Sequence, residues 1–293
     1  MTVTEIAGLT VHSYYEFQRI PNFRGDSLFL HFEMRAAGPI VEISDRFWSV
    51  TALLLCLGGV VAAQSNADTA TESQRLTRVA ETAEEQNRFD DAIKAYETIA
   101  IIGKNSPPIA ANALLHAGQI YMVTARFDKA ASSFRSSISI DPGSAEAHNA
   151  LGEALGELKQ YQSALRSFQE AVNLNGSFVR ARYNIAVTYD RLGQLKYAEF
   201  VYRILIRDHP DYPLAYDGLG VVLSKSGRAR EAIAFHQKAI SLNPRDPSFY
   251  YNSAISYLLL GDVKNALEQK QQLEKLDPAM AERLAMMIAK QQK

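Results

Sequence analysis

Cysteine is almost missing from this chain, which has one, Cys56, among 293 residues. A single cysteine cannot form an intramolecular disulfide, and it cannot supply a metal site that needs several thiolates. An excess of either charge is also missing, because 31 Lys and Arg stand against 32 Asp and Glu, for a formal net charge of -1. Proteins that bind polyanions concentrate positive charge, so we expect no nucleic acid partner.

Motifs for catalysis or cofactor binding are missing as well. The sequence has no HExxH motif, no glycine-rich phosphate loop and no G-x-S-x-G turn. Of six scattered histidines, His116 and His148 stand at near-equivalent places in the chain, where a surface or packing role is favoured over a metal pair. The acidic cluster over residues 84–91 is most simply a solvated face. We therefore expect no catalytic residue, no metal site and no cofactor.

Long hydrophobic runs are scarce, with one exception over residues 47–63, FWSVTALLLCLGGVVAA. Arg46 precedes this segment and no Lys or Arg follows it before Arg75. That asymmetry predicts that the N-terminal side stays in the cytoplasm and that the rest crosses the membrane. Small residues directly before Gln64 are typical of a signal peptidase site. If translation starts at Met34, the segment becomes a signal peptide of ordinary length.

Two other interpretations of residues 47–63 stay open. One is an uncleaved membrane anchor, although the segment is short for the roughly 17 to 25 residues that a spanning helix needs. The other is a buried core helix. Residues 1–46 are an N-terminal extension, of which the part before Met34 is not translated if translation starts there, and residues 64–72 are a polar linker. We expect an exported protein that is periplasmic or anchored at the outer side of the cytoplasmic membrane.

A period of 34 residues dominates the chain after this linker. One series of small residues consists of Ala92, Ala130, Ala164, Ala198, Ala232 and Ala266, and a second series, twelve residues earlier, of Ala80, Gly118, Gly152, Ala186, Gly220 and Ala254. Four residues after the first series stand Tyr96, Phe134, Phe168 and Tyr202, whereas His236 and Lys270 take this place in the last two units. Small residues let helices approach closely, and the aromatic rings fill the space between them.

Each unit contains two amphipathic helical segments joined by a short polar turn. Gly193, Gly227 and Gly261 lie in these turns, where glycine can adopt the left-handed conformation that ends a helix. A hairpin of this size cannot bury its apolar face alone, so we expect successive hairpins to stack. We expect the ring of His236 to be half-buried between helices.

The pattern L-G-x2-Y, then A-x3-F, then P, on a period of 34 residues, resembles the tetratricopeptide repeat (TPR) family. The resemblance covers residues 73–280 in six units, namely 73–106, 111–144, 145–178, 179–212, 213–246 and 247–280, with an insertion after the first. It implies an all-α fold, a right-handed superhelical solenoid of six helix-turn-helix repeats. Residues 281–293 are predicted to form a C-terminal capping helix.

The resemblance also implies that the first helix of each repeat lines a concave groove for a peptide. The fifth and ninth positions of each unit then point inward, and they are Leu115 and Gln119, Asn149 and Glu153, Tyr183 and Val187, Asp217 and Val221, and Tyr251 and Ile255. The predicted partner-binding groove consists of Tyr183, Val187, Val221, Tyr251 and Ile255, with Leu258 beside them and with Arg180 and Arg191 placed to receive acidic side chains. The alternative is that several of these apolar residues pack on the adjacent hairpin.

A carboxylate clamp similar to that of chaperone-binding TPR domains is not supported. Such a clamp needs Lys at the fifth and Asn at the ninth position, and here Asn184 and Asn252 stand alone. The predicted function is a non-enzymatic scaffold or adaptor of the cell envelope that binds protein or peptide segments in its groove. The alternative is a membrane-tethered assembly factor for a multi-subunit envelope or secretion machine.

Overall fold

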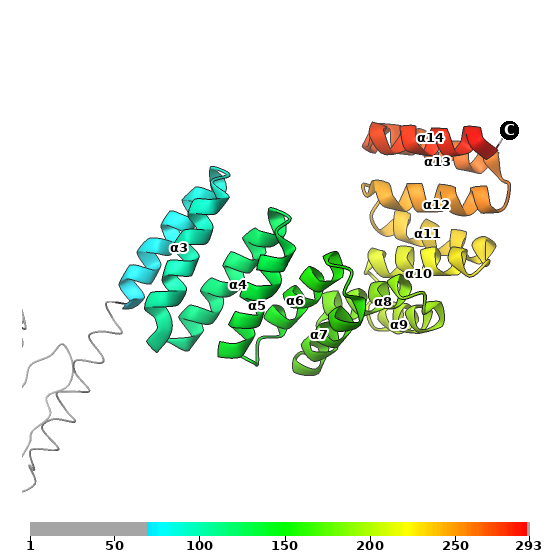
Figure 1. The fold of residues 1–293 in the computed structure, drawn as a ribbon. Helices are drawn as coiled ribbons and strands as arrows, with labels where there is room; N and C mark the ends of the chain where they lie inside the picture. Colours follow the sequence, from blue (N-terminus) through cyan, green and yellow to red (C-terminus); the bar gives the residue numbers. More distant parts are fainter. Residues whose placement is uncertain (1–68, 292–293) are drawn as a thin grey trace, which may run out of the picture. The chain divides into compact units, whose positions relative to one another are not determined.

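The structure, a computed structural model, describes residues 69–291. These residues form α-helices, one short 3-10 helix and no strand. The first helix covers residues 69–85. The others are α3 (Phe89–Ile102), η1 (Gly103–Asn105), α4 (Pro107–Val123), α5 (Phe127–Ile140), α6 (Ala145–Glu157), α7 (Tyr161–Leu174), α8 (Val179–Arg191), α9 (Leu195–Asp208), α10 (Pro213–Lys225), α11 (Ala229–Leu242), α12 (Pro247–Leu259), α13 (Val263–Leu276) and α14 (Pro278–Gln291) (Figure 1).

The helices pair into six consecutive hairpins, which we number 1 to 6. Hairpin 1 contains the helix over residues 69–85 and α3, and hairpin 6 contains α12 and α13. Each second helix also packs against the first helix of the next hairpin, and α14 packs against both helices of hairpin 6. The predicted all-α superhelical repeat fold with a C-terminal capping helix is confirmed.

The turn inside each hairpin has the same backbone conformation. Gly193, Gly227 and Gly261 have φ values of 72°, 78° and 75°, as the sequence predicts. The corresponding turns of the first three hairpins place Asn87, Ala125 and Lys159 at φ values of 57°, 56° and 58°. A side chain with a Cβ atom is strained in this left-handed region, so hairpins 1 to 3 form their turns at some cost in stability.

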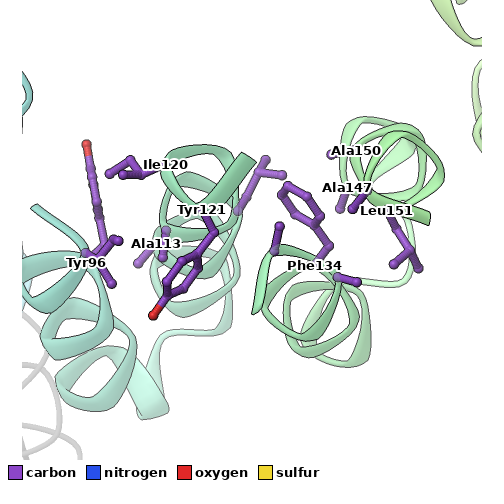
Figure 2. Packing of buried hydrophobic residues seen from close by; sticks show 14 of the residues in the cluster. Tyr96, Ala113, Ile120, Tyr121, Phe134, Ala147, Ala150 and Leu151 are labelled. Atoms are coloured by element: carbon purple, nitrogen blue, oxygen red, sulfur yellow. The ribbon is translucent and has the colours of Figure 1, made fainter. Parts of the chain in front are cut away.

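Close approach between helices depends on glycine facing an aromatic ring. A Cβ atom added to Gly118 would lie 2.4 Å from Phe134, and one added to Gly152 would lie 2.5 Å from Phe168. Figure 2 shows the ring of Phe134 between the helix that carries Tyr121 and the helix that carries Ala147. The two predicted series of small and aromatic residues therefore meet in the core, where in hairpins 2 and 3 they hold the two helices of one hairpin close together.

The buried apolar residues form separate clusters along the array. The largest runs through hairpins 1 to 3, from Ala80 to Phe168. A second lies in hairpins 4 and 5, from Ala186 to Ala232. A third joins hairpin 6 to α14, and a small fourth one joins Tyr216, Ala239 and Phe249. Because each cluster is made from adjacent hairpins, stability is local in this molecule.

Three predicted boundaries differ from the structure. Residues 69–72, predicted as linker, are helical, because Ser73 Oγ donates to the Thr69 carbonyl at 2.7 Å and Glu72 pairs with Arg75 at 2.6 Å. The capping helix begins at Pro278 and not at residue 281, since proline is well tolerated in a first helical turn. For the same reason Pro107, predicted to lie in an insertion, starts α4.

Several predictions fall outside the described residues. They are the start at Met34, the extension over residues 1–46, the hydrophobic segment over residues 47–63 and the linker residues before Thr69. Among the helices between residues 69 and 291, none combines the length and the hydrophobicity required to cross a membrane.

Candidate functional site

Four aliphatic side chains lie in line on the first helices of hairpins 4 to 6. Val187 on α8, Val221 on α10 and Ile255 on α12 occupy the same position of successive units and are partly exposed. Leu259, one turn further along α12, is 60% exposed. We call these four residues the apolar strip. Val187 is partly buried and packs against the cluster of hairpins 4 and 5, whereas Val221 and Ile255 belong to no buried cluster of the described residues and pack against none, so their exposed surface is available to a partner.

Tyr183, at the start of this face, packs mainly against its own neighbours. Its ring centroid lies 5.9 Å from that of Tyr202, and it meets Tyr212 edge-on at the same distance. Burial, with a smaller effect from nearby Tyr212 and Asp217, raises the pKa of Tyr183 to about 12. The phenol is therefore neutral at physiological pH, and most of the ring supports hairpins 4 and 5.

Tyr251, at the other end of the face, contacts the capping helix. Its hydroxyl donates to Met287 Sδ of α14 at 3.4 Å, and the ring packs against the apolar cluster of hairpin 6. This contact agrees with the alternative interpretation, in which several of the predicted groove residues pack on the adjacent part of the array. The two tyrosines therefore lie at the ends of the apolar strip and pack largely on neighbouring parts of the chain.

Arg180 is already paired inside the chain. Its Nε and Nη2 atoms donate to the two carboxylate oxygens of Glu153 on α6, at 2.8 and 2.7 Å. Glu153 also accepts from Asn149 and Asn184, each at 3.0 Å. This network bridges hairpins 3 and 4 at the junction where the largest apolar cluster ends, with Ile185 of α8 packed against that cluster.

Arg191 differs from the other cations on this face. Lys225, at the equivalent position of the next unit, donates to both oxygens of Asp190 at 2.8 and 2.7 Å. Arg191 is exposed and forms no ion pair within residues 69–291. The sequence predicted a framing role for both Arg180 and Arg191. Both side chains are exposed, but among the described residues only Arg180 has an ion-pair partner.

Four residues predicted to point into the groove are buried instead. Leu115, Asn149, Asp217 and Leu258 are each less than a tenth exposed. Leu115, Asn149 and Asp217 stand at the fifth position of a unit, which the following first helix covers, as the 3.1 Å hydrogen bond from Asn184 to Asn149 illustrates. Leu258 is buried in the cluster that hairpin 6 shares with α14.

Asn184 and Asn252, which in the sequence stand without the other residues of a carboxylate clamp, each have a side-chain partner in the structure. Asn184 donates to Asn149, and Asn252 Nδ2 donates to Asp217 Oδ2 at 2.8 Å. In both pairs the two residues are 35 positions apart, one more than the repeat period. Polar residues at this spacing were a signal in the sequence that could have revealed both contacts.

His236 takes part in the second of these polar contacts. It is 0% exposed, not half-buried as predicted, and its Nδ1 atom lies 2.7 Å from Asp217 Oδ1. Its Nε2 atom has no partner, and its ring fills the space beside Gly220 where other units place Phe134, Phe168 or Tyr202. Because the pair is enclosed, a substrate has no access to it, and its role is to join hairpins 5 and 6.

The other candidate residues have structural partners. His116 stacks on Tyr96 with ring centroids 5.1 Å apart, and His148 Nε2 lies 3.3 Å from the Pro142 carbonyl, so each has its own contact. In the acidic cluster, Asp90 pairs with Arg126 at 2.6 Å. Within the part of the chain that the structure describes, no group of three or more His, Cys, Asp or Glu side chains could hold a metal ion.

Known proteins resemble this array over part or most of its length. The peroxisomal targeting signal receptor of Saccharomyces cerevisiae is 33% identical over 81 residues, which are 28% of this chain and 13% of the receptor. A crystal structure of MamA protein is 26% identical, with a TM-score of 0.52 over 60% of this chain and 94% of MamA. The structure of PilW, a "widely conserved type IV pilus biogenesis factor", is 24% identical, with a TM-score of 0.60 over 70% of this chain and 94% of PilW, and it shares the fold.

The chain spans about a fifth or less of the length of the curated relatives it matches. Family models described as tetratricopeptide repeat match residues 80–145, 145–178, 180–212 and 218–281. These matches cover every hairpin found in the structure. The chain therefore belongs to the tetratricopeptide repeat family.

Proposed function

We propose that this chain is a non-enzymatic scaffold or adaptor that binds a segment of a partner protein along the first helices of hairpins 4 to 6. TPR proteins generally mediate protein–protein interaction, and the TPR fold is generally non-enzymatic. One relative is, by its name, a receptor for a targeting signal, although the match covers a small part of it. The observation that carries the proposal is the apolar strip on three successive first helices.

The apolar strip supplies a favourable free energy of binding. Fully burying a Val, Leu or Ile side chain stabilises a complex by about 1.5 to 3 kcal/mol, and each strip residue still has part of its surface in water. The strip residues project from rigid helices, so a partner orders little of this chain when it binds.

The test compares two double variants of the full chain in affinity capture from cell extract. Val221→Gln with Leu259→Gln removes apolar surface from the strip, and we expect it to lose the main captured protein. Ile101→Gln with Val123→Gln is the control, because these residues are 75% and 72% exposed and lie in hairpins 1 and 2. Circular dichroism should show the same helicity for both. Equal capture by the two variants would rule out the strip as the binding surface.

We further propose that the chain is exported to the cell envelope, with residues 47–63 as the export signal. The N-terminal residue of the protein purified from its native cells tests this. Gln64 as the first residue supports a released periplasmic scaffold. An intact hydrophobic segment in the membrane fraction supports the tethered assembly factor. An intact segment in the cytosolic fraction would contradict both.

A further inference from the structure

We infer that the bound segment is both acidic and apolar, with a carboxylate that pairs with Arg191 beside apolar side chains that cover the strip. This inference rests on the proposed function and specifies the chemistry of its partner. Arg191 lies one helical turn beyond Val187 on α8, so a segment that covers Val187 also approaches the guanidinium.

The ion pairs on this face single out Arg191. Arg180 is neutralised by Glu153, and Lys225 is neutralised by Asp190. Within the described residues Arg191 has no such partner. A partner carboxylate could therefore pair with Arg191 and displace no ion pair that Arg180 or Lys225 makes in the described residues.

Coverage of the strip strengthens the preference for a carboxylate. When apolar side chains of a partner remove water from Val187, they also remove water from part of Arg191. An arginine that loses hydration without gaining a hydrogen-bonded anion costs free energy. Arg191 thus discriminates against purely apolar segments, and it offers a planar pair of donors to a segment with a carboxylate.

Glu157 limits where the partner carboxylate can lie. It is exposed at the end of α6, in the position of its unit that corresponds to Arg191. A carboxylate placed towards α6 would be repelled by Glu157, whereas one placed over Arg191 would not. The acidic residue is therefore at the α8 end of the segment, and the apolar residues extend over α10 and α12.

The spacing of the helices sets the length of the segment. Packed helices lie about 8 to 10 Å apart, and an extended chain advances about 3.3 Å per residue. About three residues therefore separate the side chains that contact Val187, Val221 and Ile255. A segment of about ten residues suffices to reach from Arg191 to Leu259.

The experiment selects peptides from a displayed library of random dodecapeptides on the full chain and on two charge-reversal variants. For the unmodified chain we expect apolar residues with Asp or Glu enriched on one flank. Arg191→Glu should exchange this preference for Lys or Arg. Arg135→Glu is the control, because Arg135 is exposed on α5 and has no ion pair in the described residues. It should leave the preference unchanged.

Selected peptides are then synthesised, and their affinity is measured by fluorescence anisotropy. Replacing the acidic residue by its amide should weaken binding to the unmodified chain about three- to tenfold, and should change binding to Arg191→Gln by less than about twofold. Apolar peptides without an acidic preference would overturn this inference and leave the proposed function in place. Failure to select any peptide, or equal binding to the Val221→Gln and Leu259→Gln double variant, would overturn both.

Discussion

At the scale of single residues, the turn inside each hairpin shows how closely the units copy one another. All six turns use a left-handed residue, and in three of them this residue is not glycine. Replacing Lys159, at φ 58°, by glycine should raise the free energy of unfolding by about 1 kcal/mol, because the strain of the Cβ atom disappears. Urea denaturation followed by circular dichroism measures this change.

Gly193→Ala is the converse of this change, since Gly193 has φ 72° in the next hairpin. It should lower the free energy of unfolding by a similar amount, which urea denaturation detects as a lower midpoint. No gain in stability from Lys159→Gly would mean that the turn of hairpin 3 tolerates a side chain without strain.

A second residue-scale prediction concerns the glycine that faces Phe168. In Gly152→Ala the new Cβ atom would lie 2.5 Å from the ring, so the ring or the helix has to move, at a cost of about 1 to 3 kcal/mol. Gly156→Ala, on the same helix, is the control. It has no atom within 4 Å of an added Cβ and should be neutral or stabilising by up to about 1 kcal/mol. Thermal unfolding of both variants checks the difference, and equal melting temperatures would contradict it.

At the scale of helices and hairpins, the polar contact between Asp217, His236 and Asn252 has an apolar counterpart in the same chain. Leu115, Phe134 and Ala150 occupy the corresponding positions three units earlier. In hairpin 2 this arrangement buries Leu115 and Phe134 without a polar atom in the side chains. The chain thus fills equivalent positions between its helices with polar side chains in hairpins 5 and 6 and with apolar side chains in hairpins 2 and 3.

We predict opposite outcomes for partial and complete exchange of this contact. His236→Phe alone leaves the buried carboxylate of Asp217 with Asn252 as its remaining side-chain donor, and should destabilise the protein by about 1 to 3 kcal/mol. The triple variant Asp217→Leu, His236→Phe and Asn252→Ala should recover most of this loss, because no buried polar atom is left unpaired.

Urea denaturation of both variants at one pH gives the comparison. If the triple variant is less stable than His236→Phe, the polar contact contributes net stability and the apolar counterpart is not equivalent in hairpins 5 and 6.

The hairpins could be predicted from the sequence because the residues that form them recur at a regular spacing. Small and aromatic residues at a fixed spacing specify which helix faces meet, so the units, the glycine turns and the capping helix were all visible. Period alone does not show whether a later helix covers a given position. For this reason Asn149 and Asp217 were assigned to an open groove, although the next first helix buries them.

The candidate site was predictable to a similar degree. Val187, Val221 and Ile255 are partly exposed on one face, as the register of the repeats indicates. The contacts of Tyr183, Tyr251 and Arg180 were harder to predict. Their partners Tyr202, Met287 and Glu153 come from other helices, and the sequence of a single unit does not reveal them. Partner binding by the predicted groove residues remains a prediction.

At the scale of the whole array, each hairpin depends mainly on its neighbours. Leu273, at 0% exposed, shares its apolar cluster with Leu284 and Ile288 of the capping helix. Deleting residues 278–293 should therefore expose hairpin 6 to water. We expect amide hydrogen exchange in α12 and α13 to accelerate at least about tenfold, with no change in α4 and α5.

Met286→Gln is the control for this deletion, because Met286 is largely exposed on α14 and should not alter exchange. Acceleration in all six hairpins after the deletion would show that the array unfolds as one unit, against the local stability described above.

Because all six hairpins turn with the same backbone conformation, a further hairpin of the same kind can be added to the array. A duplicate of residues 213–246 inserted after residue 246 would meet hairpin 6 through the contacts that hairpin 5 makes now, and it would place Gly218 where Asn252 now meets Asp217 of hairpin 5. It would also carry its own copy of Val221, so the contact surface would gain one aliphatic side chain. In a protein built this way, each duplication of one repeat in the gene lengthens the surface on which a partner segment can bind.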